Sequence, residues 1–233
     1  MSGEKFGVPR ANERSGQTRG RGRPHKISRE QIIGAARGFA PEALTMQAVA
    51  DVLGVDPTSL NYYVDGREGL RELVAMDVFE SELRRITLPA EGDWRDIATL
   101  FATALRDAVV MVGALVPYLQ PPHAGGWDML APVERVLQEL VDAGFSIEEA
   151  RGALMFITDT AASAGRAVLI SRRGGDPSVA ELAATLNRVP DTDFPMLREV
   201  VVAASQGADE DRLRFELTVI IAGLQQMLIA KTS

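Results

Sequence analysis

The chain has 233 residues, of which 46% are hydrophobic, so it can bury the core of one large domain or of two smaller ones. It contains no cysteine, which excludes disulfides, thiolate zinc sites and cysteine nucleophiles. Residues 1–29 hold eight Lys or Arg and two Glu (+6), whereas the rest holds 17 basic and 30 acidic residues (−13). A basic end on an acidic body predicts that only this end meets a polyanion.

Residues 1–27 are predicted to form a basic arm, disordered when free, because they are rich in Gly, Arg and Ser and lack apolar periodicity. They also lack the apolar region of a signal peptide. The run from Arg21 to Pro24 looks like the core of an AT-hook, in which Arg21 and Arg23 would enter a narrow minor groove. A solvated basic tail is the alternative interpretation.

Helical patterns begin at Ser28, which opens a capping box with Gln31, and the first helix is predicted to end at Pro41. A short second helix is predicted to start at Thr45 and to end at a left-handed Gly54. The next two helices are predicted from Asp56-Pro57 to Val64 and from Arg67 to about Arg85.

The rest of the chain also reads as helical, so the predicted fold class is all-α. Ser146 and Glu149 form a second capping box, which opens a long helix towards Arg172. Its apolar stretch, 152–170, is interrupted by polar residues, which favours a buried helix over a membrane span. Further helices are predicted from Asp93, around 130–143, around 178–187, from Phe194 and over about 209–230.

The second and third helices, joined by a glycine turn, have the spacing of a helix-turn-helix. The segment LTMQAVADVLGV at 44–55 and its continuation to Leu70 resemble the TetR family of transcriptional regulators. Trp94, the Gly-Phe-Ser at 144–146, Phe194-Pro195 and the apolar run after Phe215 follow the order of the tetracycline-repressor type of C-terminal domain. The resemblance covers roughly residues 28–230.

The resemblance implies three parts: the arm 1–27, an N-terminal three-helix DNA-binding domain with its connecting helix at 28–85, and a larger helical domain at 86–233 for ligand binding and dimerisation. It implies a cytoplasmic homodimer that binds an operator in double-stranded DNA, with no role at a membrane. No cofactor and no metal are expected.

Roles in DNA binding follow from the matching positions. Thr45 is expected to hold a phosphate at a helix N-terminus, although a simple N-cap is the alternative. Gln47 is expected to reach a base, since glutamine suits adenine; a solvated surface glutamine is the alternative. Outward-facing residues of the third helix, with Leu60 and Val64 facing inward, are candidates for base contacts: Thr58, Ser59 and Tyr62.

Tyr63 and Arg67 are expected to clamp the DNA backbone, although Arg67 could be an ordinary exposed residue. Relatives usually carry a tyrosine at the position of Asn61 and a histidine at that of Tyr63. Tyrosine, asparagine and histidine can all hydrogen-bond a phosphate, so Asn61 and Tyr63 keep a positioning role in this interpretation.

Two C-terminal helices are expected to form a four-helix dimer interface. One offers small residues (Ala161, Ala162, Ala164, Gly165, Ala167), and the last helix is broadly apolar (Val219, Ile220, Ile221, Leu224, Leu228). Packing within one chain is the alternative.

An apolar effector pocket is expected from bulky residues on segments that line the pocket in relatives: Phe101, Leu105, Met111, Tyr118, Trp127 and Phe156. His123 and Asp159 are its candidate polar anchors. Core packing is the alternative for each bulky residue, and an ion pair with Arg166 is the alternative for Asp159. The drug-contacting polar positions of the tetracycline repressor match Leu83 and Phe101, and its metal-binding histidine has no counterpart, so the effector is expected to be mostly apolar.

The sequence therefore predicts a repressor that a small molecule releases from a palindromic operator. An architectural DNA binder without a ligand is one alternative, and an enzyme carrying a DNA-binding module is another. The chain has no P-loop, nucleophile elbow, HExxH or glycine fingerprint and only two histidines, so no catalytic activity is expected.

Overall fold

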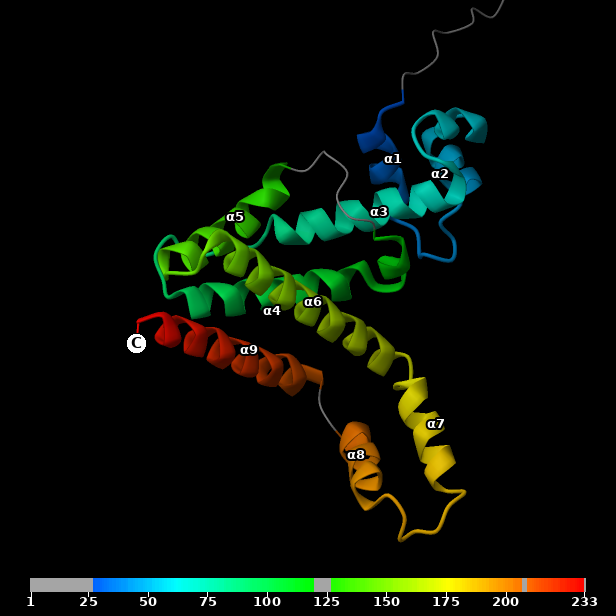
Figure 1. Ribbon diagram of the computed structural model, residues 1–233. Helices are drawn as coiled ribbons and strands as arrows, with labels where there is room; N and C mark the ends of the chain where they lie inside the picture. The colour runs from blue at the N-terminus through cyan, green and yellow to red at the C-terminus, as the bar shows by residue number, and fades with distance from the viewer. Residues whose placement is uncertain (1–26, 120–126, 207–208, 233) are drawn as a thin grey trace, which may run out of the picture.

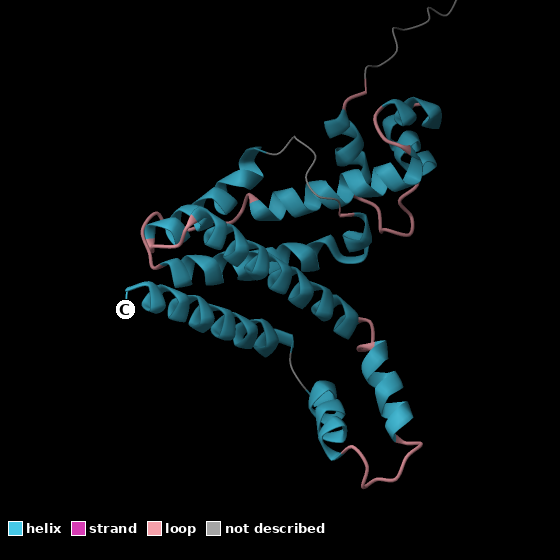
Figure 2. Cartoon of the chain, viewed as in Figure 1, coloured by secondary structure: helices cyan, strands magenta, loops and turns pink. Residues whose placement is uncertain are grey.

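The computed structural model describes residues 27–119, 127–206 and 209–232, and within these ranges all regular structure is helical (Figure 2). The predicted all-α class is confirmed. Two separate clusters of buried apolar side chains organise the molecule, one in the N-terminal unit and one among the long C-terminal helices.

The N-terminal unit consists of α1 (Arg29–Ala36), α2 (Met46–Leu53), the 3-10 helix η1 (Pro57–Tyr62) and the longer α3 (Gly66–Leu83). The predicted caps are present. Ser28 and Gln31 form the capping box of α1, and Thr45 Oγ1 accepts a hydrogen bond from the backbone N–H of Ala48. Gly54 ends α2 in the left-handed region, with φ 66° and ψ 36°, a conformation in which glycine has no Cβ penalty.

The third helix differs from the prediction, because it is a short 3-10 helix and not an α-helix reaching Val64. Asp56 caps it as expected, but the N–H of Ser59 and that of Tyr63 each bond to a carbonyl three residues back. The chain turns into α3 at Gly66, which leaves too few residues for several α-helical turns.

The N-terminal cluster is built around fully buried residues of α1, α2, η1 and α3, such as Ile32, Val49, Leu60 and Leu70. Val112 and Leu115, from the end of α4 and from η2, also belong to it. The predicted boundary between residues 85 and 86 stays a prediction, and this packing across it links the two parts of the chain.

The C-terminal body contains α4 (Trp94–Val112), η2 (Gly113–Tyr118), α5 (Trp127–Asp142), α6 (Ile147–Arg172) and α9 (Asp209–Thr232). The most extensive helix contact is between α4 and α6, and α9 lies along α6 and α4 (Figure 1). The helices α7 (Pro177–Leu186) and α8 (Pro195–Gln206) form a hairpin that projects away from the body (Figure 1).

Three helical stretches are long and apolar enough, on length and composition alone, to cross a membrane: 94–118, 147–172 and 212–231. In the fold these stretches pack against one another, because α6 contacts both α4 and α9. Within α6, Ala153, Ile157 and Ala161 are buried, whereas Asp159 and Arg166 are exposed, as predicted for a core helix with one polar side.

Candidate functional site

The outward side of η1 is a polar surface in the N-terminal unit. Leu60 is fully buried and fixes the helix to its core, while Thr58, Ser59 and Asn61 are exposed. Tyr62 is 89% exposed, and its ring stands edge-on to that of Tyr63, with 5.5 Å between the ring centroids. The predicted orientation of this segment is confirmed, and its contacts with DNA stay a prediction.

Asp56 holds the beginning of this surface in position. Its Oδ1 atom accepts hydrogen bonds from the Thr58 hydroxyl at 2.6 Å and from the Thr58 backbone N–H at 2.8 Å. These two bonds, the hydroxyl's first, lower the pKa of Asp56 below its ordinary value. The threonine methyl and the neighbouring serine are thereby held in one arrangement on the exposed side.

The start of α2 lies beside this surface in the chain. Thr45 is half-buried and caps the helix, so the capping role is confirmed, and the phosphate role stays a prediction. Gln47 is exposed, and its Nε2 donates to Asp51 Oδ1 at 2.7 Å, one helical turn away. A base contact by this Nε2 would have to compete with that bond.

Arg67 is used differently from what the sequence suggested. Its Nε donates to the carbonyl of Leu44 at 3.2 Å, and its Nη2 donates to the carbonyl of Glu42 at 3.1 Å. The guanidinium thus braces the loop that leads into α2. A phosphate contact by Arg67 stays a prediction.

Arg21, Arg23 and His123 lie outside the described residues, and Trp127 is the first residue of α5. The other candidate ligand residues do not meet in one cavity. Phe101 and Leu105 are buried in the C-terminal cluster, whereas Tyr118 packs against the N-terminal cluster. Met111 is 58% exposed. Periodicity placed these residues on helices correctly, but it carries no information on which helix faces which.

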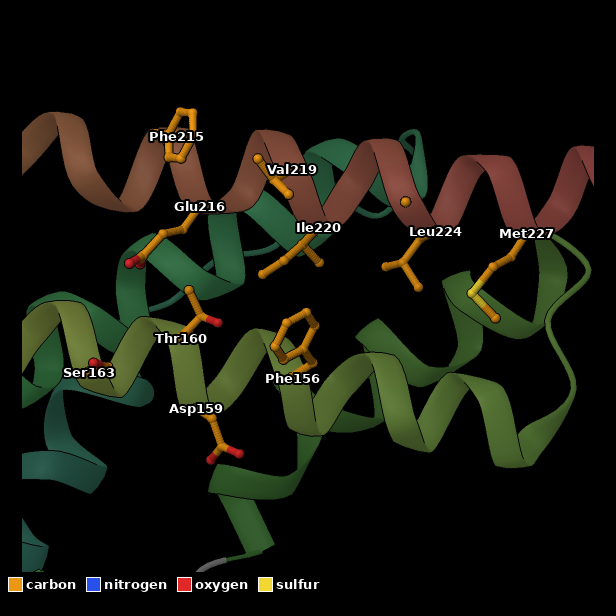
Figure 3. Close-up of a pocket in the computed structure, with 11 residues that line it drawn as sticks. Phe156, Asp159, Thr160, Ser163, Phe215, Glu216, Val219, Ile220, Leu224 and Met227 are labelled. Carbon is orange, nitrogen blue, oxygen red and sulfur yellow. The ribbon is translucent and has the colours of Figure 1, made fainter. Parts of the chain in front are cut away.

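Phe156 and Asp159 lie on the outer side of α6, where they line a groove of about 750 Å³ against α9. Phe156 is 61% exposed and points towards α9, and Asp159 points away from it (Figure 3). The interpretation that both residues share a cavity with Phe101 is therefore corrected. Asp159 makes no ion pair with Arg166 among the described contacts, so that alternative is also not supported.

The α6/α9 groove is apolar along most of its length. Ile220 and Leu224 from α9 point towards Phe156, and Phe215, which is 70% exposed, points away from α6 (Figure 3). Thr160 and Ser163 follow Phe156 by four and seven residues, a helical spacing that could have identified them from the sequence.

The small residues of α6 pack within the chain, which corrects part of the expected dimer interface. Ala161 and Ala164 are buried, and a Cβ on Gly165 would lie 2.8 Å from two carbons of Val109 on α4. The alternative of intramolecular packing therefore holds for these three residues. On α9, the uncovered apolar residues include Phe215, Val219 and Met227.

Residues 87–228 match the family described as "Tetracyclin repressor-like, C-terminal domain", which spans more than half of the chain. The chain belongs to the TetR family. Its relatives are transcriptional regulators. It is 26% identical over 208 residues to the tetracycline repressor protein class A from transposon 1721 of Escherichia coli, covering 85% of this chain and 91% of that protein.

Solved TetR-family structures share the fold. Apo ActR from Streptomyces coelicolor is 22% identical, covers 87% of this chain and 98% of its own, and has a TM-score of 0.69. ActR in complex with actinorhodin is 22% identical, covers 86% and 96%, and has a TM-score of 0.65.

One link between the two parts of this TetR-family chain could not be read from the sequence. Arg71 on α3 donates to the Tyr118 hydroxyl at 2.7 Å, stacks over its ring at 5.2 Å, and reaches the carbonyl of Pro41 at 3.4 Å. The end of η2 is thereby tied to the loop that precedes α2. Such a contact joins residues 47 positions apart, and no local pattern announces it.

Proposed function

We propose that this TetR-family chain is a repressor that binds a palindromic operator as a homodimer and leaves it when a mostly apolar small molecule binds. The observation that carries the DNA-binding part is the side of η1 on which Thr58, Ser59, Asn61 and Tyr62 are exposed. Buried Leu60 and the Asp56 cap hold this side rigid, which favours base recognition because little order is lost on binding.

The groove between α6 and α9 supports the dimer. A chain in water does not usually leave large side chains such as Phe156, Phe215 and Val219 exposed on one continuous surface. A two-fold related copy would bury the same residues on both protomers. Two recognition segments would then meet two half-sites about one helical turn apart, or a multiple of it.

Release by a ligand is supported by the packing across the two parts of the chain. Val112 and Leu115 belong to the N-terminal cluster, so a shift of α4 would be felt beside α2 and η1. ActR, a structural neighbour, has been solved with actinorhodin, which supports a largely apolar organic effector here as well. A ligand that favours a protomer arrangement unfit for DNA must be excluded by DNA to the same degree.

The test is selection of a binding site from random duplexes, followed by fluorescence anisotropy with the full chain. Tyr62→Ala should weaken binding to the selected site about tenfold, the range expected for one good base contact, and should affect random DNA less. Thr185→Ala, an exposed change on α7, is the matched control. Equal affinity for selected and random DNA would contradict the proposal.

The ligand arm uses the same assay with a library of apolar metabolites and antibiotics. A compound that raises the melting temperature and weakens operator binding in proportion is the expected result, by linkage. If no compound does both, the chain is a DNA-binding protein without an effector, which is the remaining alternative.

A further inference from the structure

A second cleft lies on the other side of α9 from the α6/α9 groove. It is formed by α4 and α9 and has a volume of about 630 Å³. Apolar side chains of α9, including Leu213, Leu217 and Ile221, line part of it. Its polar lining comes from both helices: Thr99, Thr103, Arg106, Arg214, Thr218 and Gln225.

Arg106 is the unusual group in this cleft. Its side chain is only 17% exposed, and its Nε is buried without a hydrogen bond. Asp107 Oδ1 lies 2.8 Å from this Nε, so the two charges attract, but the neighbouring residue does not meet the N–H in hydrogen-bonding geometry. A mostly desolvated guanidinium without a bonded acceptor is costly, and an incoming carboxylate would relieve that cost.

The surroundings favour an anion over a cation or a neutral ligand. Arg214 adds a second positive charge from α9, and none of the described residues lining the cleft is acidic. The hydroxyls of Thr99, Thr103 and Thr218 already donate to carbonyls of their own helices. The arginines are therefore the main donors that a ligand would meet.

The apolar residues set the rest of the ligand. Leu217 is buried and Ile221 packs against the C-terminal cluster, so the floor of the cleft is firm and hydrophobic. A small inorganic anion would leave this floor in contact with water, whereas an alkyl or aryl body would cover it. The ligand that fits both features has one anionic head and an apolar body.

We propose that the α4/α9 cleft binds an amphipathic organic carboxylate, with its head on Arg106 and its body along Leu217 and Ile221. This site differs from the α6/α9 groove, and it would exist whether or not an apolar effector releases the chain from DNA. Both copies in a dimer would carry one such site.

The experiment is isothermal titration of the full chain with decanoate, with decanol and inorganic phosphate as separate ligands. Decanoate should bind at one site per chain, and decanol and phosphate should each bind at least tenfold more weakly, because each lacks one of the two features. Arg106→Gln should weaken decanoate binding tenfold or more, since a charge-assisted hydrogen bond is lost. Arg166→Gln, an exposed arginine on α6, should leave it unchanged.

A second variant keeps the test valid if Arg106→Gln does not fold. Thr218 is exposed at the cleft, so Thr218→Trp should fill it without disturbing the core and should abolish binding. Equal binding of decanol or phosphate, or unchanged decanoate binding in Arg106→Gln or in Thr218→Trp, would overturn the proposal. None of these outcomes depends on DNA binding, so the proposed repressor function is tested separately.

Discussion

The N-terminal unit and the α4–α6–α9 layer differ in what each leaves uncovered. The N-terminal unit buries its apolar residues within one chain and exposes a polar surface on η1. The C-terminal layer buries one side of α6 and α9 and leaves large apolar residues such as Phe156 and Phe215 exposed. The first arrangement suits a polar partner, and the second suits another protein surface.

The two regions also differ in how they are specified. Caps and a terminating glycine, within a few residues of one another, define α1, α2 and η1. The C-terminal layer depends on the fit between helices far apart in sequence, as at the close approach of Gly165 to Val109. Each of the changes below acts on one region and should leave the other largely intact.

The largest effect is expected from charges on the uncovered surface of α9. The double change Phe215→Glu and Val219→Glu should convert a dimer to monomers at micromolar concentration, because each interface would bury unpaired carboxylates. Operator affinity should fall roughly 100-fold or more, since one protomer reaches only one half-site. Sedimentation velocity and anisotropy measure the two effects. Leu130→Glu, on exposed α5, is the control that should change neither.

A substantial loss of stability is expected from Gly165→Ala. The new Cβ would lie 2.8 Å from Val109 side-chain carbons and 2.9 Å from the Arg106 carbonyl oxygen, so α4 and α6 must separate. Overpacking of this kind costs about 1–3 kcal/mol. Denaturant unfolding measures it. Gly152→Ala in the same helix meets nothing within 4 Å and should instead stabilise by roughly 0.5–1 kcal/mol. Equal shifts in both variants would contradict this packing.

The helices of both regions follow from the sequence, but the faces of the C-terminal helices do not. Thr45, Gly54 and Asp56 act through atoms two to four residues away, so their roles could be predicted. Phe156 and Ala161 sit on one apolar helix with opposite surroundings, and helical periodicity does not say which side meets α4. Arg67 and Arg71 bind carbonyls that only the tertiary fold brings near, so the sequence could not assign them.

A moderate effect is expected from Thr45→Ala in the N-terminal unit. Loss of the hydrogen bond from Ala48 N–H to Thr45 Oγ1 should destabilise the unit by about 1 kcal/mol, as for other N-cap threonines. Thr45→Ser keeps the hydroxyl and should restore most of the stability. If serine and alanine behave alike in thermal unfolding, the cap does not contribute.

The smallest effect is expected at the C-terminal end of the layer, where Lys231 pairs with Glu149 and also donates to the Gly144 carbonyl at 3.2 Å. The Lys231 ammonium, followed by the backbone N–H and hydroxyl of Ser146, lowers the pKa of Glu149 from 4.5 to about 2. Because the folded-state pKa is depressed, this stabilisation is present above pH 4.5 and is lost as the pH falls towards 2.

Glu149→Gln should therefore lower the melting temperature slightly at neutral pH and make its fall between pH 4.5 and 2 shallower. Glu148→Gln, an exposed change on the same helical turn, is the control. Parallel melting curves for wild type and Glu149→Gln across this range would show that the ion pair adds nothing to stability.

The contrast between a polar N-terminal surface and an apolar C-terminal one is tested most directly by the number of chains on one operator. Sedimentation velocity of the full chain with a fluorescent duplex selected for binding measures the mass of the complex. The account predicts two chains on each palindromic duplex, held together by the α6/α9 surface. A complex with a single chain, at the same affinity as the full palindrome, would contradict it.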